Sequence, residues 1–288
     1  MAIVTSVVTL THNKLDYTRR CLGSLLRTAG DPWELIVVDN GSTDGTREWL
    51  ETFKSEGAAH GVDVRLVCNA TNVGCSTARN QGRAAAVGRN VVFVDNDVAL
   101  RSRHWLDQLG RALAVDHTVG IVGPKLVYPF GPHDIQFAGG AVSPTGRVQF
   151  LGRGEHKNDP RFNKPREVQC FISACFMIRR EALDATGGFD EAFNPVEYED
   201  IDYCYRLRSR GYRILYEPSV EMYHFESVTT AGTKTLPNTY LIIRNGMRFK
   251  NRWRHMFAAE NGPSDDETKW RQIETRRLSD VCELPVID

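Results

Sequence analysis

Runs of β-branched and aromatic residues alternate with amphipathic segments over the first hundred positions of the chain. Buried strands are predicted at residues 3–10, 34–38, 62–68 and 91–94, because each is rich in Val, Ile or Leu and ends at polar residues. Apolar residues at helical spacing follow the first two strands, and a small-residue segment that begins near residue 72 follows the third. Four successive strand-then-helix units predict an α/β fold with a mostly parallel, Rossmann-like central sheet flanked by helices.

The pattern changes in the second half of the chain. A helix is predicted at 102–115 and a strand at 119–124, followed by a Gly- and Pro-rich stretch at 129–165 that we interpret as a partly β insertion. Further predictions are a strand at 171–178, a helix at 198–210, a short strand at 212–216, a polar-aromatic loop at 222–230 and a basic amphipathic helix at 236–257. Residues 259–288 lack apolar periodicity and are expected to form a peripheral or mobile tail.

Polar side chains follow the carboxyl ends of the predicted strands. They are Asn13, Asp39, Asn72, Asp95 and Asp97. In an open parallel sheet these ends meet at one edge, so the five side chains are expected to line one crevice. If the backbone stays extended through Asn96, Asp95 and Asp97 project to the same side and suit Mg²⁺ or Mn²⁺. The alternative is that both aspartates cap the helix that follows.

Charge and cysteine content narrow the class of protein. The 36 Lys and Arg residues balance the 36 Asp and Glu residues, so no global field indicates nucleic acid as a partner. No apolar run is long enough to cross a bilayer, which leaves at most peripheral membrane association. The seven cysteines are scattered without a C-x-x-C pair, a pattern that fits thiols in a reducing compartment. We therefore expect a cytoplasmic protein, either free or peripheral at the inner face of the membrane.

Five motifs in order resemble those of family-2 inverting glycosyltransferases with the GT-A fold. They are Val37-Val38-Asp39-Asn40-Gly41-Ser42-Thr43-Asp44-Gly45-Thr46; Asn72-Val73-Gly74 with Ala78-Arg79-Asn80-Gln81-Gly82; Asp95-Asn96-Asp97; Gly187-Gly188-Phe189-Asp190-Glu191 with Glu199-Asp200-Ile201-Asp202; and His224 with Ser227. The resemblance covers roughly residues 3–252, and residues 123–126 and 199–206 are most similar to bacterial rhamnosyl- and related cell-surface glycan transferases. It implies a single domain over 1–258, with a nucleotide-binding half at 1–115 and an acceptor-binding half at 116–258.

The resemblance also implies roles on the donor side. Asp39 would accept a hydrogen bond from the nucleobase with Asn13 and Asn72 nearby, although a turn-forming Asp is the alternative. Arg79 would serve the diphosphate, Asp97 would bind the divalent cation, and Asp95 would contact the ribose or the water shell of the metal. His224 either completes the metal sphere, which would favour Mn²⁺ over Mg²⁺, or is a hydrogen-bonded structural residue.

On the acceptor side, the resemblance implies that Asp200 is the general base that deprotonates the acceptor hydroxyl. Glu199, Asp200 and Asp202 also suit a helix amino terminus, which is the preferred account of Asp202. Because a helix turns by about 100° per residue, Glu199 and Asp200 cannot point in one direction. One of them would then hold the other in place or meet the acceptor.

The implied reaction moves a sugar from a nucleotide diphosphate donor to a hydroxyl acceptor. UDP is the default nucleotide, with dTDP and GDP open, and the acceptor is a saccharide, a lipid-linked glycan or a protein hydroxyl. Two alternatives remain. One is a nucleotidyltransferase that makes nucleotide sugars, although residues 11–14 lack the expected glycine. The other is a catalytically silent carbohydrate-binding module on the same fold.

Overall fold

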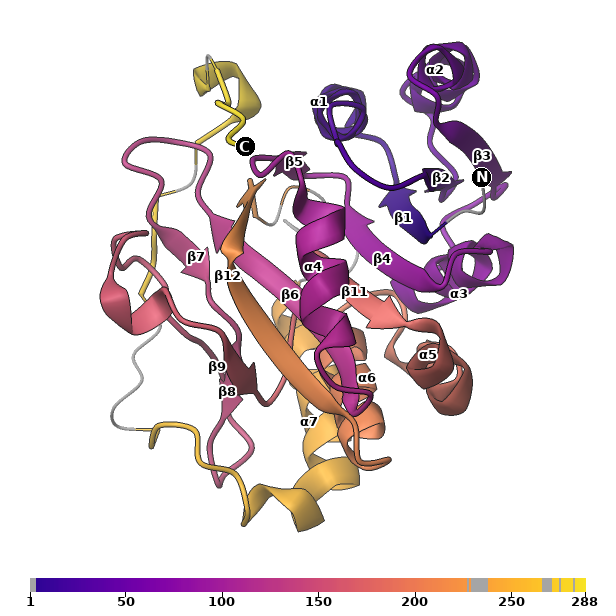
Figure 1. The fold of residues 1–288 in the computed structure, drawn as a ribbon. Coiled ribbons are helices and arrows are strands. Elements are labelled where there is room, and N and C mark those ends of the chain that lie inside the picture. The colour runs from indigo at the N-terminus through magenta and orange to yellow at the C-terminus, as the bar shows by residue number, and fades with distance from the viewer. Residues whose placement is uncertain (1–3, 227, 229–237, 266–270, 275, 282) are drawn as a thin grey trace.

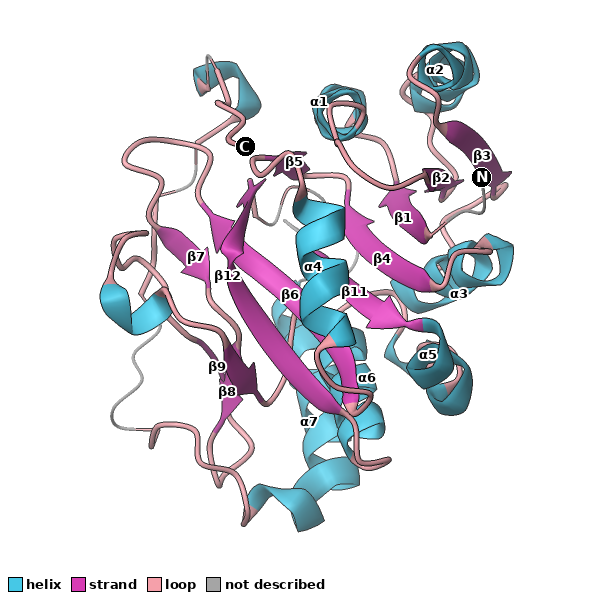
Figure 2. Cartoon of the chain, viewed as in Figure 1, coloured by secondary structure: helices cyan, strands magenta, loops and turns pink. Residues whose placement is uncertain are grey.

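A computed structural model describes residues 4–226, 228, 238–265, 271–274, 276–281 and 283–288. Its strands are β1 (Thr5–Thr11), β2 (Trp33–Asp39), β3 (Asp63–Cys68), β4 (Asn90–Asp95), β5 (Val98–Leu100), β6 (Val119–Val127), β7 (Ile135–Phe137), β8 (Gly140–Val142), β9 (Val148–Phe150), β10 (Arg166–Val168), β11 (Cys175–Arg179) and β12 (Arg213–His224). Its helices are α1 (Leu15–Leu25), α2 (Thr46–Ala59), α3 (Cys75–Ala85), α4 (Trp105–Ala114), α5 (Arg180–Thr186), α6 (Glu199–Arg208) and α7 (Asn238–Phe257). Helices cover both faces of one central sheet, with α4 on one face and α6 and α7 on the other (Figures 1 and 2).

The first four strands form the parallel part of the sheet, in the order β3-β2-β1-β4. This confirms the α/β prediction, and the strand bounds agree with the sequence pattern to within two residues. The register sets Thr11 level with Asp39, and Leu10 level with Asp95. The polar ends of these strands therefore reach the same edge of the sheet.

Beyond β4 the sheet becomes mixed. Strand β11 is antiparallel to both of its neighbours, β4 and β6, whereas β12 runs parallel to β6. The stretch at 129–165 is partly β, as expected: Ile135 and Phe137 are fully buried, β7 pairs with β6, and β8 and β9 form a hairpin. Strands β12 and β10 follow β6 at this side of the sheet, while β7 pairs with β6 outside this order.

The polar-aromatic loop expected at 222–230 is wrong in its first three residues. Strand β12 is twelve residues long and ends only at His224. Its pairing with β6 is interrupted by a bulge between Glu217 and Glu221, where Pro218 lacks the N–H that a ladder needs. The strand resumes after the bulge and pairs with β6 and β5. The proline made one strand look like a short strand and a loop.

The carboxyl-terminal part of the chain packs on the domain where it is described. Trp253 on α7 is buried, and its indole N–H donates to Asp202 Oδ1 at 2.9 Å. Val281 and Leu284 are also buried, and Ile287 forms a β-bridge with Ser102. Among the described residues, no helix has both the length and the apolar character that a bilayer-spanning segment requires.

Candidate functional site

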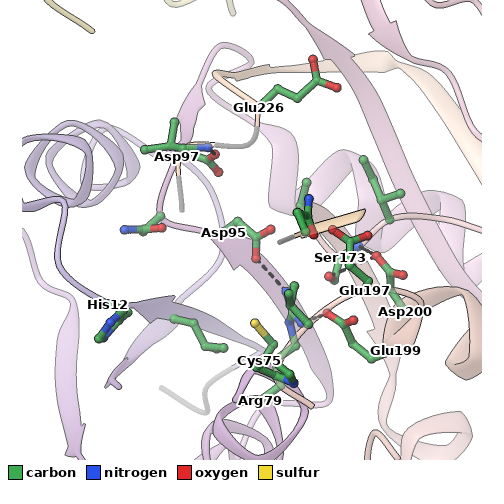
Figure 3. Close-up of a pocket in the computed structure, with 18 of the residues that line it drawn as sticks. His12, Cys75, Arg79, Asp95, Asp97, Ser173, Glu197, Glu199, Asp200 and Glu226 are labelled. Atoms are coloured by element: carbon green, nitrogen blue, oxygen red, sulfur yellow. Dashed lines mark hydrogen bonds and ion pairs between the residues drawn. The ribbon is translucent and has the colours of Figure 1, made fainter. Parts of the chain in front are cut away.

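A cavity of about 660 Å³ opens at the carboxyl edge of β1 and β4 (Figure 3). Its walls come from the ends of these strands, the start of α3, residues 172–174 and 195–200, the end of β12 and the first turn of α7. The volume falls within the range of small-molecule sites. Of the site residues predicted from sequence, it gathers Asn72, Arg79, Asp95, Asp97, Glu199, Asp200 and His224.

Asp95 and Asp97 are not on one extended strand, so that expectation is wrong. Strand β4 ends at Asp95, and Asn96 and Asp97 form a turn that leads into β5. The buried Asn96 side chain fixes this turn, because its Nδ2 donates to Thr18 Oγ1 at 3.0 Å and to Thr11 Oγ1 at 3.3 Å. Asp95 therefore points toward Arg79, while Asp97 is held apart at another part of the cavity (Figure 3).

Asp97 meets His224 across the β5–β12 pairing. The register sets His224 opposite Val98, one residue beyond Asp97, and the Phe225 N–H donates to the Asp97 carbonyl at 3.0 Å. His224 Nε2 lies 3.3 Å from Asp97 Oδ1, and both side chains are buried. Burial favours the uncharged form of each group, but the pair's mutual attraction outweighs it, which raises the pKa of His224 and lowers the pKa of Asp97.

A glutamine on the predicted insertion completes this pair. His224 Nδ1 lies 2.9 Å from Oε1 of the fully buried Gln136 on β7. In the neutral imidazole, a proton on Nδ1 donated to Gln136 leaves the Nε2 lone pair facing Asp97. The Gln136 Nε2 group has no hydrogen-bond partner among the described residues, and Gln136 lines the cavity. A ligand in the cavity would find a free donor there.

The fit of this pair to a divalent cation can be judged from its donors. No group of three or more His, Cys, Asp or Glu side chains within the described residues is arranged to hold a metal ion. Asp97 and His224 offer one carboxylate oxygen and one imidazole nitrogen at the cavity wall. Two such donors suit a cation whose other positions are filled by water and by phosphate oxygens. Asp95 is directed elsewhere, since its Oδ1 accepts from Arg79.

Arg79 joins the two halves of the predicted domain through a buried contact with Glu199 and a partly exposed contact with Asp95. From α3, its Nη2 donates to Asp95 Oδ1 at 2.9 Å and its Nη1 donates to Glu199 Oε1 at 2.6 Å (Figure 3). Burial raises the pKa of Glu199 to about 7, with Asp200 adding to the effect and Arg79 opposing it. Burial also raises the pKa of Asp95 despite the Arg79 charge. The two carboxylates thus occupy the Arg79 guanidinium, which is not free in this state to donate hydrogen bonds to a phosphate.

The two acids at the start of α6 diverge, as the helical turn predicts. Glu199 faces Arg79, whereas Asp200 Oδ2 accepts from the backbone N–H and Oγ of Ser173 at 2.9 and 3.3 Å. Asp200 is only partly buried and lines the cavity, so a hydroxyl can reach it. Asp202 points into the core, where it accepts from Trp253 and from Arg252. Asp202 therefore links α7 to α6 through hydrogen bonds, in addition to any favourable interaction of its charge with the amino terminus of α6.

Two of the predicted donor residues do not line the cavity. Asp39 is fully buried, with Oδ2 bound by Arg47 Nε at 2.8 Å and Oδ1 by the Ser42 N–H at 3.1 Å. Asn13 Oδ1 accepts from the Thr43 N–H at 2.8 Å and so holds the turn that follows β2. A nucleobase that binds Asp39 would have to displace Arg47, which is partly exposed. Ser227, named with His224 in the last motif, lies outside the described residues.

Sequence reasoning missed several residues that contribute polar groups to the cavity, and three of them bear on its chemistry. They are Gln136, Ser173 and Glu197. The only signal for Gln136 was a single polar residue between Ile135 and Phe137 in a stretch without clear periodicity. Ser173 falls within the strand predicted at 171–178, but β11 begins only at Cys175, and Glu197 precedes the helix predicted at 198–210. In both irregular segments no pattern fixes the direction of a side chain.

Comparison with known sequences gives related proteins over most of the chain. The model of the family described as glycosyl transferase family 2 matches residues 6–187. A Sinorhizobium fredii protein, y4gI, is 35% identical over 88% of this chain and 28% of its own length. The Myxococcus xanthus O-antigen biosynthesis protein RfbC is 30% identical over 78% of this chain and 17% of its own. The N-acetylglucosaminyl-diphospho-decaprenol L-rhamnosyltransferase of Mycobacterium tuberculosis is 27% identical over 80% of this chain and 78% of its own. The chain thus spans less than a third of the length of y4gI and of RfbC.

Several solved structures superimpose on this chain. GalNAc-T7, crystallised with UDP, GalNAc and Mn²⁺, superimposes with a TM-score of 0.70 at 17% identity over 88% of this chain and 49% of that one. The mannosyltransferase PcManGT of Pyrobaculum calidifontis, in complex with GDP-Man and Mn²⁺, gives a TM-score of 0.56 at 21% identity over 88% of this chain and 72% of that one. At these identities the likeness concerns the fold.

Proposed function

Because this chain belongs to glycosyl transferase family 2, we propose that it is a metal-dependent, inverting enzyme that uses a nucleotide diphosphate sugar. It is a glycosyltransferase with the GT-A fold. The observation that carries the finer proposal is the arrangement of one cavity. The Asp97–His224 pair lies at one part of its wall and the carboxylate of Asp200 at another, with room between them for a ligand.

The donor diphosphate binds near Asp97 and His224 in this proposal. These two side chains would hold the cation, which when bound neutralises the charge of the departing diphosphate. The imidazole favours Mn²⁺ over Mg²⁺, and two structural neighbours have Mn²⁺ in their complexes. The Gln136 amide orients His224 and offers its free N–H₂ to the donor. UDP is the default nucleotide, with dTDP and GDP as the other candidates.

Asp200 is the proposed general base. It takes the proton of the acceptor hydroxyl as that oxygen forms the new bond to the anomeric carbon, while the bond from this carbon to the diphosphate oxygen breaks on the opposite face. Two hydrogen bonds from Ser173 hold the Asp200 carboxylate in place. Glu199 is unsuited to this role, because it is buried and engaged by Arg79. Its contact fixes the start of α6 and thereby Asp200.

The names of two relatives support a proposal for the acceptor class. One is named for O-antigen biosynthesis and another for transfer to a diphospho-decaprenol glycan, so a saccharide of the cell surface, including a lipid-linked one, is the proposed acceptor. A free saccharide or a protein hydroxyl would present the same nucleophile. The reaction would take place in the cytoplasm, either in solution or at the inner face of the membrane.

The first experiment is a thermal-shift screen of UDP, dTDP, GDP and CMP, each with Mn²⁺, with Mg²⁺ and with a chelator. We expect one nucleoside diphosphate to stabilise the protein only in the presence of metal, because Asp97 and His224 would hold the cation whose charge favours binding of the diphosphate. The Asp97→Asn variant should lose this metal-dependent shift when it is measured against the variant's own midpoint without ligand. Binding of no nucleotide under any condition would remove the transferase proposal and favour the silent carbohydrate-binding module.

A second experiment tests the general base with the nucleotide sugar that the screen identifies. Asp200→Asn should keep nucleotide binding but slow turnover by about 10²- to 10⁴-fold, as loss of general-base help does. Glu197→Gln is the matched control, because Glu197 is another cavity carboxylate close to Asp200. If Glu197→Gln shows the large loss and Asp200→Asn does not, Glu197 is the base instead.

A further inference from the structure

Exposed apolar side chains are concentrated on one helix. Seven large hydrophobic residues are exposed within the described part of the chain, and four of them lie in the first half of α7. They are Tyr240, Ile242, Ile243 and Met247, with exposed fractions of 41% to 61%. Single exposed hydrophobic residues are ordinary, but a cluster on one short surface marks a site of interaction.

The cluster belongs to a regular stripe along the outer side of α7. Tyr240, Ile243, Met247, Lys250 and Arg254 are spaced by three and four residues, so they share one face of the helix. We call these five residues the outer stripe. All five are exposed, whereas Leu241, Phe249, Trp253 and Phe257 pack into the core from the inner side. The stripe is apolar in its first half and basic in its second.

The charge of α7 is of one sign. The helix contains five Lys and Arg residues and no Asp or Glu. Three of the arginines bond to the body of the protein: Arg244 to the Asn194 carbonyl, Arg248 to the Ala192 carbonyl, and Arg252 to Asp190 and Asp202. Lys250 and Arg254 are exposed to solvent on the outer stripe. This local positive charge stands out in a chain whose total charge is zero.

The apolar half of the stripe borders the cavity. Asn238, Leu241 and Ile242, from the same two turns as Tyr240 and Ile243, line the cavity that holds Asp200. A surface that covers the outer stripe would therefore lie beside the entrance through which an acceptor reaches Asp200.

We propose that the outer stripe docks the protein on the surface of an anionic lipid bilayer, with α7 lying in the interface plane. Tyr240, Ile243 and Met247 enter the boundary between headgroups and acyl chains, while Lys250 and Arg254 contact anionic headgroups. A second copy of the chain complements the stripe less well, because pairing two stripes in parallel brings equal charges together. Pairing them antiparallel sets basic side chains against apolar ones. Only a surface that is both apolar and anionic matches the two halves.

Vesicle flotation of the full chain tests this proposal and requires no sugar donor. The vesicles contain phosphatidylcholine alone or phosphatidylcholine with phosphatidylglycerol. We expect binding to the anionic vesicles, and a decrease of at least about ten-fold in Ile243→Glu/Met247→Glu, because each of the two apolar side chains no longer enters the interface. Lys250→Gln/Arg254→Gln should weaken binding to anionic vesicles by about five-fold for each charge removed.

Matched controls lie elsewhere on the surface. Val87→Glu/Val115→Glu makes the same change of charge at two exposed valines, and Lys54→Gln/Arg111→Gln removes two exposed charges away from α7. Both controls should bind as the unaltered chain does, and all variants should keep its thermal midpoint. Equal loss in the controls, no binding of the unaltered chain to anionic vesicles, or a dimer in solution that the Ile243→Glu/Met247→Glu change dissociates would overturn the proposal. Because nucleotide binding is measured separately, failure here leaves the proposed reaction untouched.

Discussion

Arg79 is a position where removing one charge should have a large and measurable effect on stability. Its side chain is 4% exposed and forms ion pairs with Glu199 and Asp95. Arg79→Met keeps the aliphatic stem but leaves both carboxylates without their cation. Breaking a buried ion pair typically costs about 3–5 kcal/mol, because the remaining charge is buried and unpaired. We expect a decrease of about this size in the free energy of unfolding at about pH 8.

The effect should depend strongly on pH, and the pKa of Glu199 gives the direction. This pKa rises from its ordinary value of 4.5 to about 7 in the folded protein. Between pH 4.5 and pH 7 the folded protein therefore holds a proton on Glu199 that the unfolded chain has lost. The contribution of this group to stability is full below pH 4.5 and is lost as the pH rises through 7. Because each pKa unit corresponds to about 1.4 kcal/mol, the free energy of unfolding of the unaltered protein should decrease by about 3 kcal/mol across this pH range. Without Arg79 the pKa of Glu199 rises further, so the variant should regain most of its lost stability at about pH 5.

The assay is urea unfolding followed by tryptophan fluorescence at both pH values, with the slope of the transition checked for constancy. Arg83→Met is the matched control on the same helix. Arg83 Nη2 lies 3.6 Å from Asp184 Oδ1, and this ion pair is more exposed than the pair of Arg79 with Glu199. That variant should lose less than about 1 kcal/mol. A loss at Arg79 that is equally small, or one that is the same at both pH values, would refute the reasoning from burial.

Two further substitutions separate positioning from packing. Gln136→Leu removes the acceptor for His224 Nδ1 and should weaken nucleotide-dependent Mn²⁺ binding by about 10- to 100-fold in calorimetry, whereas Gln136→Glu should restore it. Unchanged Mn²⁺ affinity in Gln136→Leu would remove Gln136 from the site. Asp202→Leu removes the acceptor of the Trp253 indole N–H, whereas Arg252 keeps Asp190, and should cost about 1–3 kcal/mol in urea unfolding without lowering nucleotide affinity. A large loss of affinity at unchanged stability would contradict that structural role.

The sequence was most informative where burial is periodic. Strands β1 to β4 could be predicted because each is a short apolar run that ends at polar residues, and the parallel order then brings Asp95 and Asn72 to the same cavity. The divergence of Glu199 from Asp200 followed from helical geometry alone. These inferences depend on local patterns, which the sequence records directly.

The errors arose where a partner distant in sequence decides the outcome. The contact of Asp39 with Arg47 from the next helix was also not visible in the sequence, and the predicted role of Asp39 toward a nucleobase stays a prediction. The turn at Asn96 depends on Thr18, and no local pattern predicts that contact. The basic helix predicted at 236–257 gave no sign that the Trp253 indole N–H donates to Asp202 in the core. Tertiary hydrogen bonds of this kind have no periodic signal in the sequence.

The bulge in β12 has a consequence for how the length of this chain can change. Between Glu217 and Glu221 the strand carries three residues that have no counterpart between the adjacent residues Pro124 and Lys125 of β6. Because successive side chains of a strand point to opposite faces, a slip of one position would turn His224 away from Asp97. The length of this segment therefore determines to which face of the sheet the last side chains of β12 point. We expect that deletion of two residues here is tolerated, whereas deletion of one residue separates His224 from Asp97, although no residue of the bulge touches the cavity.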